Sequence, residues 1–520
     1  MEEYRIGDRL QIGDHVCTIR YIGTIAAWKD ELTFGVEWDD PGRGKHSGAL
    51  NGVKYFSTVK DNAGSFIKYS KVMKYVRVGF FEAIEEVYGT PTELGNDVRI
   101  SSKKIEFLGF DVLNDRNQHL DSLKIISLQR RSISFTIPRS ETDSAVIRSF
   151  NGLTSLNVSY NLYSDFEDIL QLLRISPNLC TLNISGNKFN SNTFTSCERT
   201  EFNNIKHLSA ANCNLSIEDT ITILEYFPHL ETLDLSYNDL SKLVDVSLDL
   251  PLNLKSLFLS NNYLSALPRG YYHWNINSLD LSNNKIRSVD TSLCGESKYT
   301  SLSIVGLDLS HNKIERWDVV DHLNEIFPNL KSLRINGNPI MAEDCSETYH
   351  ESLEQSNILF LNTLARFNNL DILNGSHLTA DIKNESELYF VSALCSENLT
   401  LSKDTKRWVY FEDKYCLTQQ ISKQALLRRE DDTLLRALEI LKINIQFQDQ
   451  ITISVNILPS SSIRYMKSVI SRQIGVSIRK FKMLYEPTKD KESRVEICRN
   501  FSLVSDLAMT DGSVIYVVLD

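Results

Sequence analysis

The chain has 520 residues, of which 42% are hydrophobic and 24% charged, and its formal net charge is −11 at pH 7. This length predicts about two to four domains, and the composition is that of an ordinary soluble globular protein. No apolar run reaches the roughly 18 residues that a membrane-spanning helix needs. The first residues, MEEYRIGDRLQIGD, are polar and lack a signal-peptide core. We therefore expect a cytoplasmic protein with no membrane partner.

The charge is unevenly distributed along the chain. Residues 1–80 carry 12 Lys and Arg against 10 Asp and Glu, and residues 441–520 carry 11 against 8, whereas the middle carries 33 against 49. An acidic body with a mildly basic module at each end argues against nucleic acid as a partner. Nine scattered cysteines without a Cys-x-x-Cys motif argue against a disulfide framework or a zinc site.

Residues 1–80 are rich in glycine and aromatic residues and contain short β-prone runs such as HVCTIRYIG and LTFGVEWD, which predict a small, strongly bent β-barrel or sandwich. The glycines between Gly42 and Gly48 would let backbone amides approach a ligand, and Lys45 among them is a candidate partner for a carboxylate. A phosphate-binding loop is excluded because His46 replaces its Ser or Thr. Five aromatic residues either wall a shallow groove beside Lys45 or fill a small core: Trp28, Phe34, Trp38, Phe56 and Phe66.

Residues 79–89 have the spacing of a short amphipathic helix, and the polar residues that follow predict a helix-and-linker region at 81–104. From Leu120 the sequence LDSLKIISL weakly echoes the repeat described next, so we expect a solenoid to begin near residue 105. Some cap is expected at this end, because an open solenoid end exposes its apolar core.

The phrase Leu-x-x-Leu-x-Leu-x-x-Asn-x-Leu recurs eight times between Leu153 and Ile340. Steps of 22 to 28 residues fall within the leucine-rich-repeat period and predict an α/β solenoid whose strands line a concave face. The paired leucines of each repeat should point inward, as should the Asn, whose amide can satisfy backbone groups buried in a tight coil. The Asn positions are Asn161, Asn187, Cys213, Asn238, Asn262, Asn284, Asn312 and Asn338.

The outward position between the paired strand leucines varies from repeat to repeat. It holds Asn157, Asn183, Ser209, Asp234, Phe258, Asp280, Asp308 and Arg334. Phe258 alone is large and apolar, which is typical either of an interface anchor or of a residue that only stacks on its strand neighbours. Asp280 and Asp308 favour a basic or hydrogen-bond-donating patch on a partner. We predict a client-binding surface on the concave face at Phe258, Asp280, Asp308 and Arg334.

Beyond the repeats, the sequence predicts a C-terminal cap that ends the solenoid region at 105–399, a linker with a short helix at 400–440, and a separate module at 441–520. That module reads as a hairpin, a helix and a last strand after the turn at Gly512. This order resembles the ubiquitin-like β-grasp family. The chain as given ends at Asp520 without a Gly-Gly tail, so the resemblance implies docking as the module's role, with the proteasome as one possible partner.

No signature of an enzyme was found. The chain lacks a Gly-x-Ser-x-Gly elbow, a His-Glu-x-x-His motif, a dinucleotide fingerprint and a kinase signature. The ten histidines are dispersed, and we interpret those on the repeats, such as His207 and His311, as solvated. We expect no enzymatic activity, no cofactor and no metal site.

The segments RYIGTI, FGVEWDDPGRGKHSGALNGVKYF and GSFIKYSKV together resemble the CAP-Gly domain family across nearly all of residues 1–80. The resemblance implies binding of an acidic, aromatic-ended tail such as that of α-tubulin, with Lys45 facing the tail carboxylates. It further implies that Phe34 and Phe66 line the groove. The signature spans Gly44, Lys45, His46 and Gly48, and it departs from the family's Asn-Asp at His46 and Ser47.

The order CAP-Gly, leucine-rich repeat, ubiquitin-like resembles the tubulin-folding cofactor E family over nearly the whole chain. The resemblance implies a chaperone that binds the tail and the body of α-tubulin. It would act with cofactors B, C and D and β-tubulin in assembling, and in dissociating, the heterodimer, in the cytoplasm and in association with the cytoskeleton.

Two alternatives remain open. One is a microtubule-associated CAP-Gly adaptor, which a dimerising coiled coil would support, but no sustained heptads are visible. The other is a leucine-rich regulatory subunit of a phosphatase or of a ubiquitin ligase, which the N-terminal module disfavours.

Overall fold

The computed structural model forms two compact units, Met1–Leu394 with Leu399–Lys414, and Cys395–Asn398 with Tyr415–Asp520. Within them, no helix of the described residues is long and apolar enough to cross a membrane. The residues that the structure describes are 4–72, 77–89, 99–100, 103–104, 123–138, 149–289, 300–341, 358–396, 398–421, 441–447, 451–459, 461–485, 495–497, 503–507, 509 and 512–519.

The N-terminal module is built on a four-stranded antiparallel sheet in the order β1-β2-β3-β6. Alternate residues of the second strand point inward, so Cys17 and Ile19 are fully buried against Val36 of the third. A short hairpin and one helical turn complete the module. Its elements are β1 (Arg9–Ile12), β2 (His15–Ile25), β3 (Trp28–Trp38), η1 (Pro41–Arg43), β4 (Ala49–Leu50), β5 (Val53–Lys54), β6 (Gly64–Lys68) and α1 (Tyr69–Val72).

The segment after this module closes the first end of the solenoid. Strand β7 (Val78–Gly79) pairs in parallel with β11 (Ile133–Phe135), and α2 (Phe80–Ile84) continues into the π-helical turn η2 (Glu85–Gly89). Phe80 and Ile84 are buried in the same core as the first repeats, so the helix predicted here acts as a cap. Strands β8 (Arg99–Ile100) and β9 (Lys103–Lys104) form a hairpin. The other residues between 90 and 122, including the predicted solenoid start at 105, lie outside the described residues.

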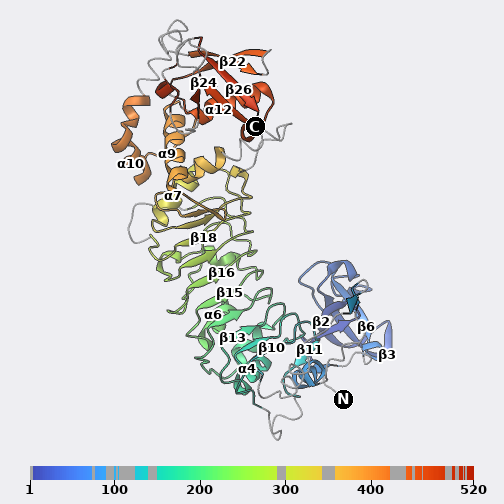
Figure 1. Cartoon of the computed structure of the whole chain (residues 1–520). Helices are drawn as coiled ribbons and strands as arrows, with labels where there is room; N and C mark the ends of the chain where they lie inside the picture. The colour runs from blue at the N-terminus through green and yellow to red at the C-terminus, as the bar shows by residue number, and fades with distance from the viewer. Residues whose placement is uncertain are drawn as a thin grey trace. The chain divides into compact units, whose positions relative to one another are not determined.

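The repeats form one continuous sheet, which has eleven strands within the described residues. Figure 1 shows the strands stacked in chain order along the solenoid. Consecutive repeats pair in parallel with the strand leucines in register, as for Leu233 and Leu257, and only the last pair is antiparallel. The strands are β10 (Ile125–Ser127), β12 (Ser155–Asn157), β13 (Thr181–Asn183), β14 (His207–Ser209), β15 (Thr232–Asp234), β16 (Ser256–Phe258), β17 (Ser278–Asp280), β18 (Gly306–Asp308), β19 (Ser332–Arg334), β20 (Ile372–Leu373) and β21 (Ser376–His377).

The predicted Asn ladder is present and buried. Asn262 is fully buried, and its amide nitrogen donates to Leu235 O at 3.0 Å while its Oδ1 accepts from the N–H groups of Asn238 at 2.9 Å and Leu240 at 3.2 Å. Cys213 takes the same place, with its thiol donating to Ile184 O at 3.3 Å. Each Asn therefore joins two consecutive turns of the coil through backbone groups that would otherwise be buried without a partner.

The segments that return from one strand to the next are helical only where the repeat is long enough. Asp165 caps α4 by accepting from Glu167 N at 3.1 Å, and Ser216 and Asp219 form a capping box on α6. The two shortest repeats, which end at Asn262 and Asn284, have only single 3-10 turns. The return elements are α4 (Phe166–Ile175), α5 (Ser191–Ser196), α6 (Ile217–Tyr226), η4 (Ser241–Val244), η5 (Tyr271–His273), α7 (Trp317–Ile326) and η8 (Pro339–Met341).

Helices α9 (Ala380–Cys395) and α10 (Lys406–Tyr415) follow the last repeat. Arg366 is fully buried and pairs with Asp321 of α7, and its guanidinium also lies 4.5 Å from the ring centre of Trp317. Asp321 additionally accepts from Ser402 N and Oγ, both at 2.9 Å. These two hydrogen bonds help to satisfy the buried carboxylate of Asp321. Ser402, at the start of the region predicted as a linker at 400–440, therefore belongs to the cap that ends the solenoid. Residues 422–440 lie outside the described residues.

The C-terminal module is a five-stranded mixed sheet in the order β23-β22-β26-β24-β25, with β22 and β26 parallel. Ile463, Met466 and Ile470 of α12 are buried in its core, and this strand order with one packed helix is the ubiquitin-like β-grasp fold that the sequence predicted. Its elements are β22 (Leu441–Phe447), β23 (Ile451–Ile457), α12 (Ile463–Ile474), η10 (Ile478–Lys480), β24 (Phe481–Tyr485), β25 (Val495–Glu496), η11 (Val504–Leu507) and β26 (Val514–Leu519).

Candidate functional site

The glycine-rich loop of the N-terminal module lies directly against the start of β6. Lys45 N donates to Gly64 O at 2.7 Å, and Gly64 N donates to His46 O at 2.7 Å. A side chain at Gly44 would place its Cβ 1.9 Å from Asn62 O. Gly48 has a φ of +97°, and a Cβ there would lie 2.2 Å from Phe56 O. These two positions therefore require glycine, which holds the loop close to the sheet.

Lys45 is exposed at the tip of this loop, and among the described residues its ammonium group has no ion-pair partner. His46 beside it is half-buried, and its Nδ1 accepts from Gly48 N at 3.0 Å. Burial, and then the charge of Lys45, lower the pKa of His46. At neutral pH the loop therefore presents the Lys45 cation next to a neutral imidazole whose Nε2 carries the proton. Arg43 of the same loop is also exposed, and its guanidinium lies 4.5 Å from the ring centre of Trp38.

An aromatic cluster adjoins the loop; we use this name for Tyr21, His46, Tyr55, Phe56 and Phe66. The His46 and Phe66 rings are 4.9 Å apart, Tyr55 and Phe66 are 5.4 Å apart, and Tyr21 and Tyr55 are 5.4 Å apart. Phe66 is half-buried, so part of its side chain remains accessible. Tyr21 and Tyr55 were not predicted. Strand alternation would place Tyr21 on the same face as Cys17 and Ile19, but the register of β2 against β3 shifts between Ile19 and Tyr21.

The structure corrects the predicted role of Phe34. Its side chain is 1% exposed and packs in the module core against Tyr4 and Tyr69, with ring centres 5.4 and 5.5 Å away. Trp38 and Phe56 are also buried. Phe34 cannot line an accessible groove in this conformation, because it points to the inner face of β3.

The four residues predicted for the concave face are brought together. Register pairing places Phe258, Asp280, Asp308 and Arg334 side by side on β16 to β19. Asp280 Oδ1 accepts from Ser282 N at 2.8 Å, and Asp308 Oδ1 accepts from Ser310 N at 2.9 Å. The second oxygen of Asp308 lies 3.7 Å from Arg334 Nη1. The carboxylates are therefore held by turns of their own repeats, and the last one is partly neutralised.

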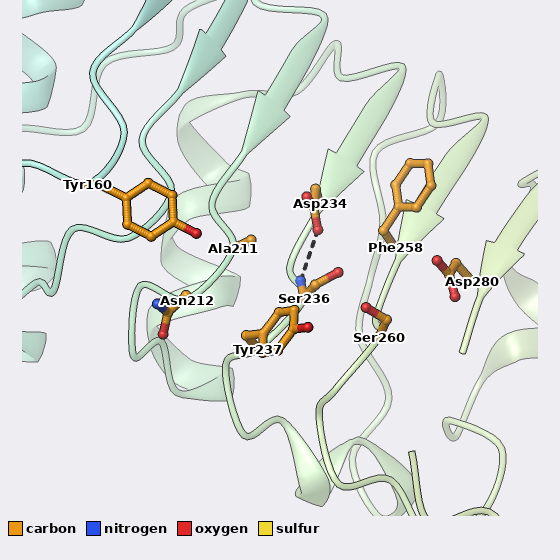
Figure 2. A pocket seen from close by; sticks show the side chains of 9 residues that line it. All are labelled: Tyr160, Ala211, Asn212, Asp234, Ser236, Tyr237, Phe258, Ser260 and Asp280. Atoms are coloured by element: carbon orange, nitrogen blue, oxygen red, sulfur yellow. Dashed lines mark hydrogen bonds between the residues drawn. The ribbon is translucent and has the colours of Figure 1, made fainter. Parts of the chain in front are cut away.

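A hollow of about 430 Å³ lies on this face, and we call it the sheet-face pocket. Figure 2 shows Phe258 and Asp280 on neighbouring strands with Asp234, across from the rings of Tyr160 and Tyr237. Asp308 and Arg334 are not among its lining residues. The two tyrosines were missed, and the signal was their shared position directly before a ladder Asn. The lining residues are Tyr160, Ala211, Asn212, Asp234, Ser236, Tyr237, Phe258, Ser260 and Asp280.

One histidine on the repeats departs from the expectation that they are solvated. His207 and His311 are exposed, but His322 of α7 is buried, with Nδ1 2.6 Å from Asp318 O and Nε2 3.2 Å from Asp404 Oδ2. Burial alone would lower the pKa of His322, but these two hydrogen bonds outweigh it and raise the pKa. Its surroundings are those of a structural residue, and no group of three metal-ligating side chains occurs within the described residues.

The architecture defines a multidomain protein with a CAP-Gly domain, a leucine-rich-repeat solenoid and a ubiquitin-like domain. Residues 6–72 match the family model of the CAP-Gly domain, and residues 229–249 match that of the Leucine Rich Repeat. The C-terminal region aligns with the solution structure of the C-terminal ubiquitin-like domain of mouse tubulin-specific chaperone e. That likeness has 15% identity and a TM-score of 0.15 and covers 16% of this chain and 88% of that one, so the assignment of the third domain rests on its strand order.

Relatives match along the whole length of the chain. It is 32% identical to Protein PAC2 of Saccharomyces cerevisiae over 99% of this chain and 96% of that protein. It is 25% identical to Tubulin-specific chaperone E of Xenopus laevis, over 96% of each chain. The chain belongs to the family of Protein PAC2 and tubulin-specific chaperone E.

Proposed function

We propose that this protein is a tubulin-folding chaperone that binds α-tubulin and takes part in assembling and dissociating the αβ-tubulin heterodimer. The observation that carries the proposal is the exposed cation Lys45, held on a closely packed glycine-rich loop beside half-buried aromatic rings. It belongs to a chain that aligns from end to end with proteins named tubulin-specific chaperone E.

In this proposal the acidic tail of α-tubulin binds the CAP-Gly domain. Lys45 pairs with a tail carboxylate, and the aromatic cluster packs on the apolar or aromatic residues of the tail. The Nε2–H group of His46 replaces the amide donor that the family's Asn would supply. Phe34 contributes only indirectly, from β3, which pairs with the strands β2 and β6 that carry Tyr21 and Phe66.

The body of α-tubulin is proposed to bind the sheet face of the solenoid at Phe258, Asp280, Asp308 and Arg334. Two sites on one chain raise the effective concentration of the client at the second site once the first is occupied. Each contact can then be weak and reversible, as a chaperone that releases its client requires. We further propose that cofactors B, C and D, the last with β-tubulin, are the partners in assembly.

The ubiquitin-like domain is proposed as a docking module, with the proteasome as a candidate partner. We also propose that the protein works by binding alone, without catalysis, in the cytoplasm and in association with the cytoskeleton. The absence of a recognisable catalytic motif in the sequence supports this proposal.

Mixing the purified full chain with αβ-tubulin and following the species by size exclusion and mass photometry tests the proposal. A one-to-one complex with α-tubulin, with β-tubulin released or captured by cofactor D, is the expected result. Binding only to intact heterodimer or polymer, lost after the tubulin tails are clipped, would favour a microtubule-associated adaptor instead. No binding to tubulin in any form would refute both.

A further inference from the structure

The sheet-face pocket is formed by two rows of residues that run across consecutive repeats. One row is the outward strand position, which holds Asp234, Phe258 and Asp280 in register. The other row directly precedes the ladder Asn and includes Tyr160 and Tyr237, whose φ angles are +54° and +62°. This left-handed backbone is uncommon for tyrosine. Figure 2 shows the Tyr160 ring directed toward Ala211 and the Tyr237 ring beside Ser236.

The Tyr160 ring is held in place from two sides. A Cβ added at Gly186, the equivalent position of the next repeat, would lie 2.5 Å from the ring, so the ring rests on that glycine's backbone. The guanidinium of Arg130 lies 5.1 Å from the ring centre. The missing side chain at residue 186 therefore makes room for the ring, which lines the hollow.

The pocket is negatively charged and contains no cation of its own. Asp234 Oδ1 accepts from Ser236 N at 3.0 Å. This is the same type of turn as the one in which Asp280 accepts from Ser282 N. Within the described part of the chain neither carboxylate has an ion-pair partner, and no lysine, arginine or histidine lines the hollow. Burial, together with the charges of Asp308 and Asp234, raises the pKa of Asp280. A bound cation would relieve this unfavourable burial of charge.

Oriented carboxylates beside aromatic faces are the combination that binds an organic cation, since the carboxylates pair with its charge and the rings attract it through their negative faces. We infer that the sheet-face pocket binds the cationic side chain of one lysine or arginine on the tubulin client, with Phe258 packing on its aliphatic stem. This inference rests on the proposed function and specifies the chemistry of its body site. Charge complementarity selects the occupant: an acidic segment would be repelled by Asp234 and Asp280.

The double variant Asp234→Asn/Asp280→Asn tests the inference, because Asn keeps the Oδ1 that accepts the turn hydrogen bond and removes only the charge. The matched control is Asp245→Asn/Asp249→Asn, which removes two exposed carboxylates from the segment between β15 and β16. We expect the dissociation constant of the full chain for αβ-tubulin to rise about tenfold or more in the pocket variant, and to change by less than about twofold in the control. The salt dependence of binding should also weaken only in the pocket variant.

A second variant tests the aromatic wall. Tyr237→Asn is compatible with the left-handed backbone, since Asn212 and Asn261 occupy the equivalent position of neighbouring repeats. It should weaken tubulin binding about three- to tenfold without changing the circular dichroism spectrum. This variant also covers the case in which the double variant folds poorly.

Chemical modification of tubulin distinguishes whether the bound cation is a lysine or an arginine. Binding that is lost on acetylated tubulin and kept on reductively methylated tubulin identifies a lysine, because methylation retains the charge. Binding kept on both, but still weakened by the pocket variant, identifies an arginine. If both pocket variants bind tubulin as tightly as the wild type, the inference is wrong while the proposed function stands. If the wild type itself does not bind tubulin, the proposed function fails and the inference fails with it.

Discussion

The glycine-rich loop of the CAP-Gly domain and the sheet-face pocket both combine aromatic rings with charged side chains, but the charges have opposite signs. In the loop the exposed cation Lys45 stands beside the aromatic cluster, whereas in the pocket two carboxylates, Asp234 and Asp280, stand beside Phe258 and two tyrosines. The first arrangement suits an acidic tail and the second a basic side chain. Under the proposed function, one chain would bind two chemically different features of the same client.

The two regions also differ in how their residues are held. The loop depends on local backbone contacts, with Gly44 and Gly48 packed against neighbouring backbone. The pocket depends on the repeat itself, because strand register and the Asn ladder place residues from five different repeats on one surface. Damage to the ladder should thus spread through the pocket, whereas damage to the loop should remain local.

The largest expected effect is on the ladder. Asn262→Ala leaves Leu235 O and two backbone N–H groups without their buried partner. The unfolding free energy should fall by about 2–4 kcal/mol. The matched control, Asn253→Ala at an exposed position of the same solenoid, should stay within about 0.5 kcal/mol of the wild type. Calorimetry of the full chain measures both, and binding of an α-tubulin tail peptide should be unchanged in each. Equal stabilities of the two variants would contradict the ladder's proposed role.

The next effect is on the loop. Lys45→Ala should weaken binding of an α-tubulin tail peptide by about 1–3 kcal/mol, because a charge-assisted pair is lost. Lys71→Ala, which removes an exposed lysine on α1 of the same domain, serves as the control and should leave the affinity nearly unchanged. Isothermal calorimetry measures both. An unchanged affinity for Lys45→Ala would remove this residue from the site.

A smaller effect concerns the protonation of His46. Because the pKa of His46 is lowered in the folded domain, His46 binds a proton less readily there than in the unfolded chain, where it titrates near pH 6.5. This contribution to stability is therefore present above pH 6.5 and is lost as the pH falls through the lower folded pKa, and after solvent screening it should amount to less than about 1 kcal/mol. Histidine-selective NMR of the full chain, with His46→Asn to assign the signal, measures the pKa. A value above 6.5 would contradict the prediction.

The smallest expected effect is an increase in stability. Asp280→Asn keeps the turn but removes a half-buried charge beside two other carboxylates, so the unfolding free energy at pH 7 should rise by roughly 0.5 kcal/mol even as tubulin binding weakens. For the wild type, the raised pKa means that this destabilisation disappears as the pH falls toward the ordinary range of an aspartate. Thermal unfolding at pH 7 and pH 4.5 measures both effects. Lower stability of Asp280→Asn at pH 7 would show that the charge is structurally required.

Much of the architecture could be predicted from local patterns in the sequence. The repeat phrase predicted the inward leucines, the Asn ladder and the outward row of Phe258, Asp280, Asp308 and Arg334, because a solenoid places equivalent residues of successive repeats in equivalent positions. The ubiquitin-like fold followed from its hairpin, helix and last strand, since period-two and helical spacings report burial directly.

Only the tertiary structure decided which aromatic residues are accessible and which segments meet. Phe34 and Phe66 look alike in the sequence, but Phe34 lies in the core and Phe66 lies beside His46. The β3–β6 register pairs Phe34 with Ile67, which places Phe66 on the opposite face of the sheet. The cap formed by Arg366, Asp321 and Ser402 joins residues about 80 positions apart, and no local pattern reports such a contact. The sheet-face pocket likewise needs rings and carboxylates from several repeats. The sequence by itself therefore determined the repeating scaffold, and long-range packing decided where that scaffold is open.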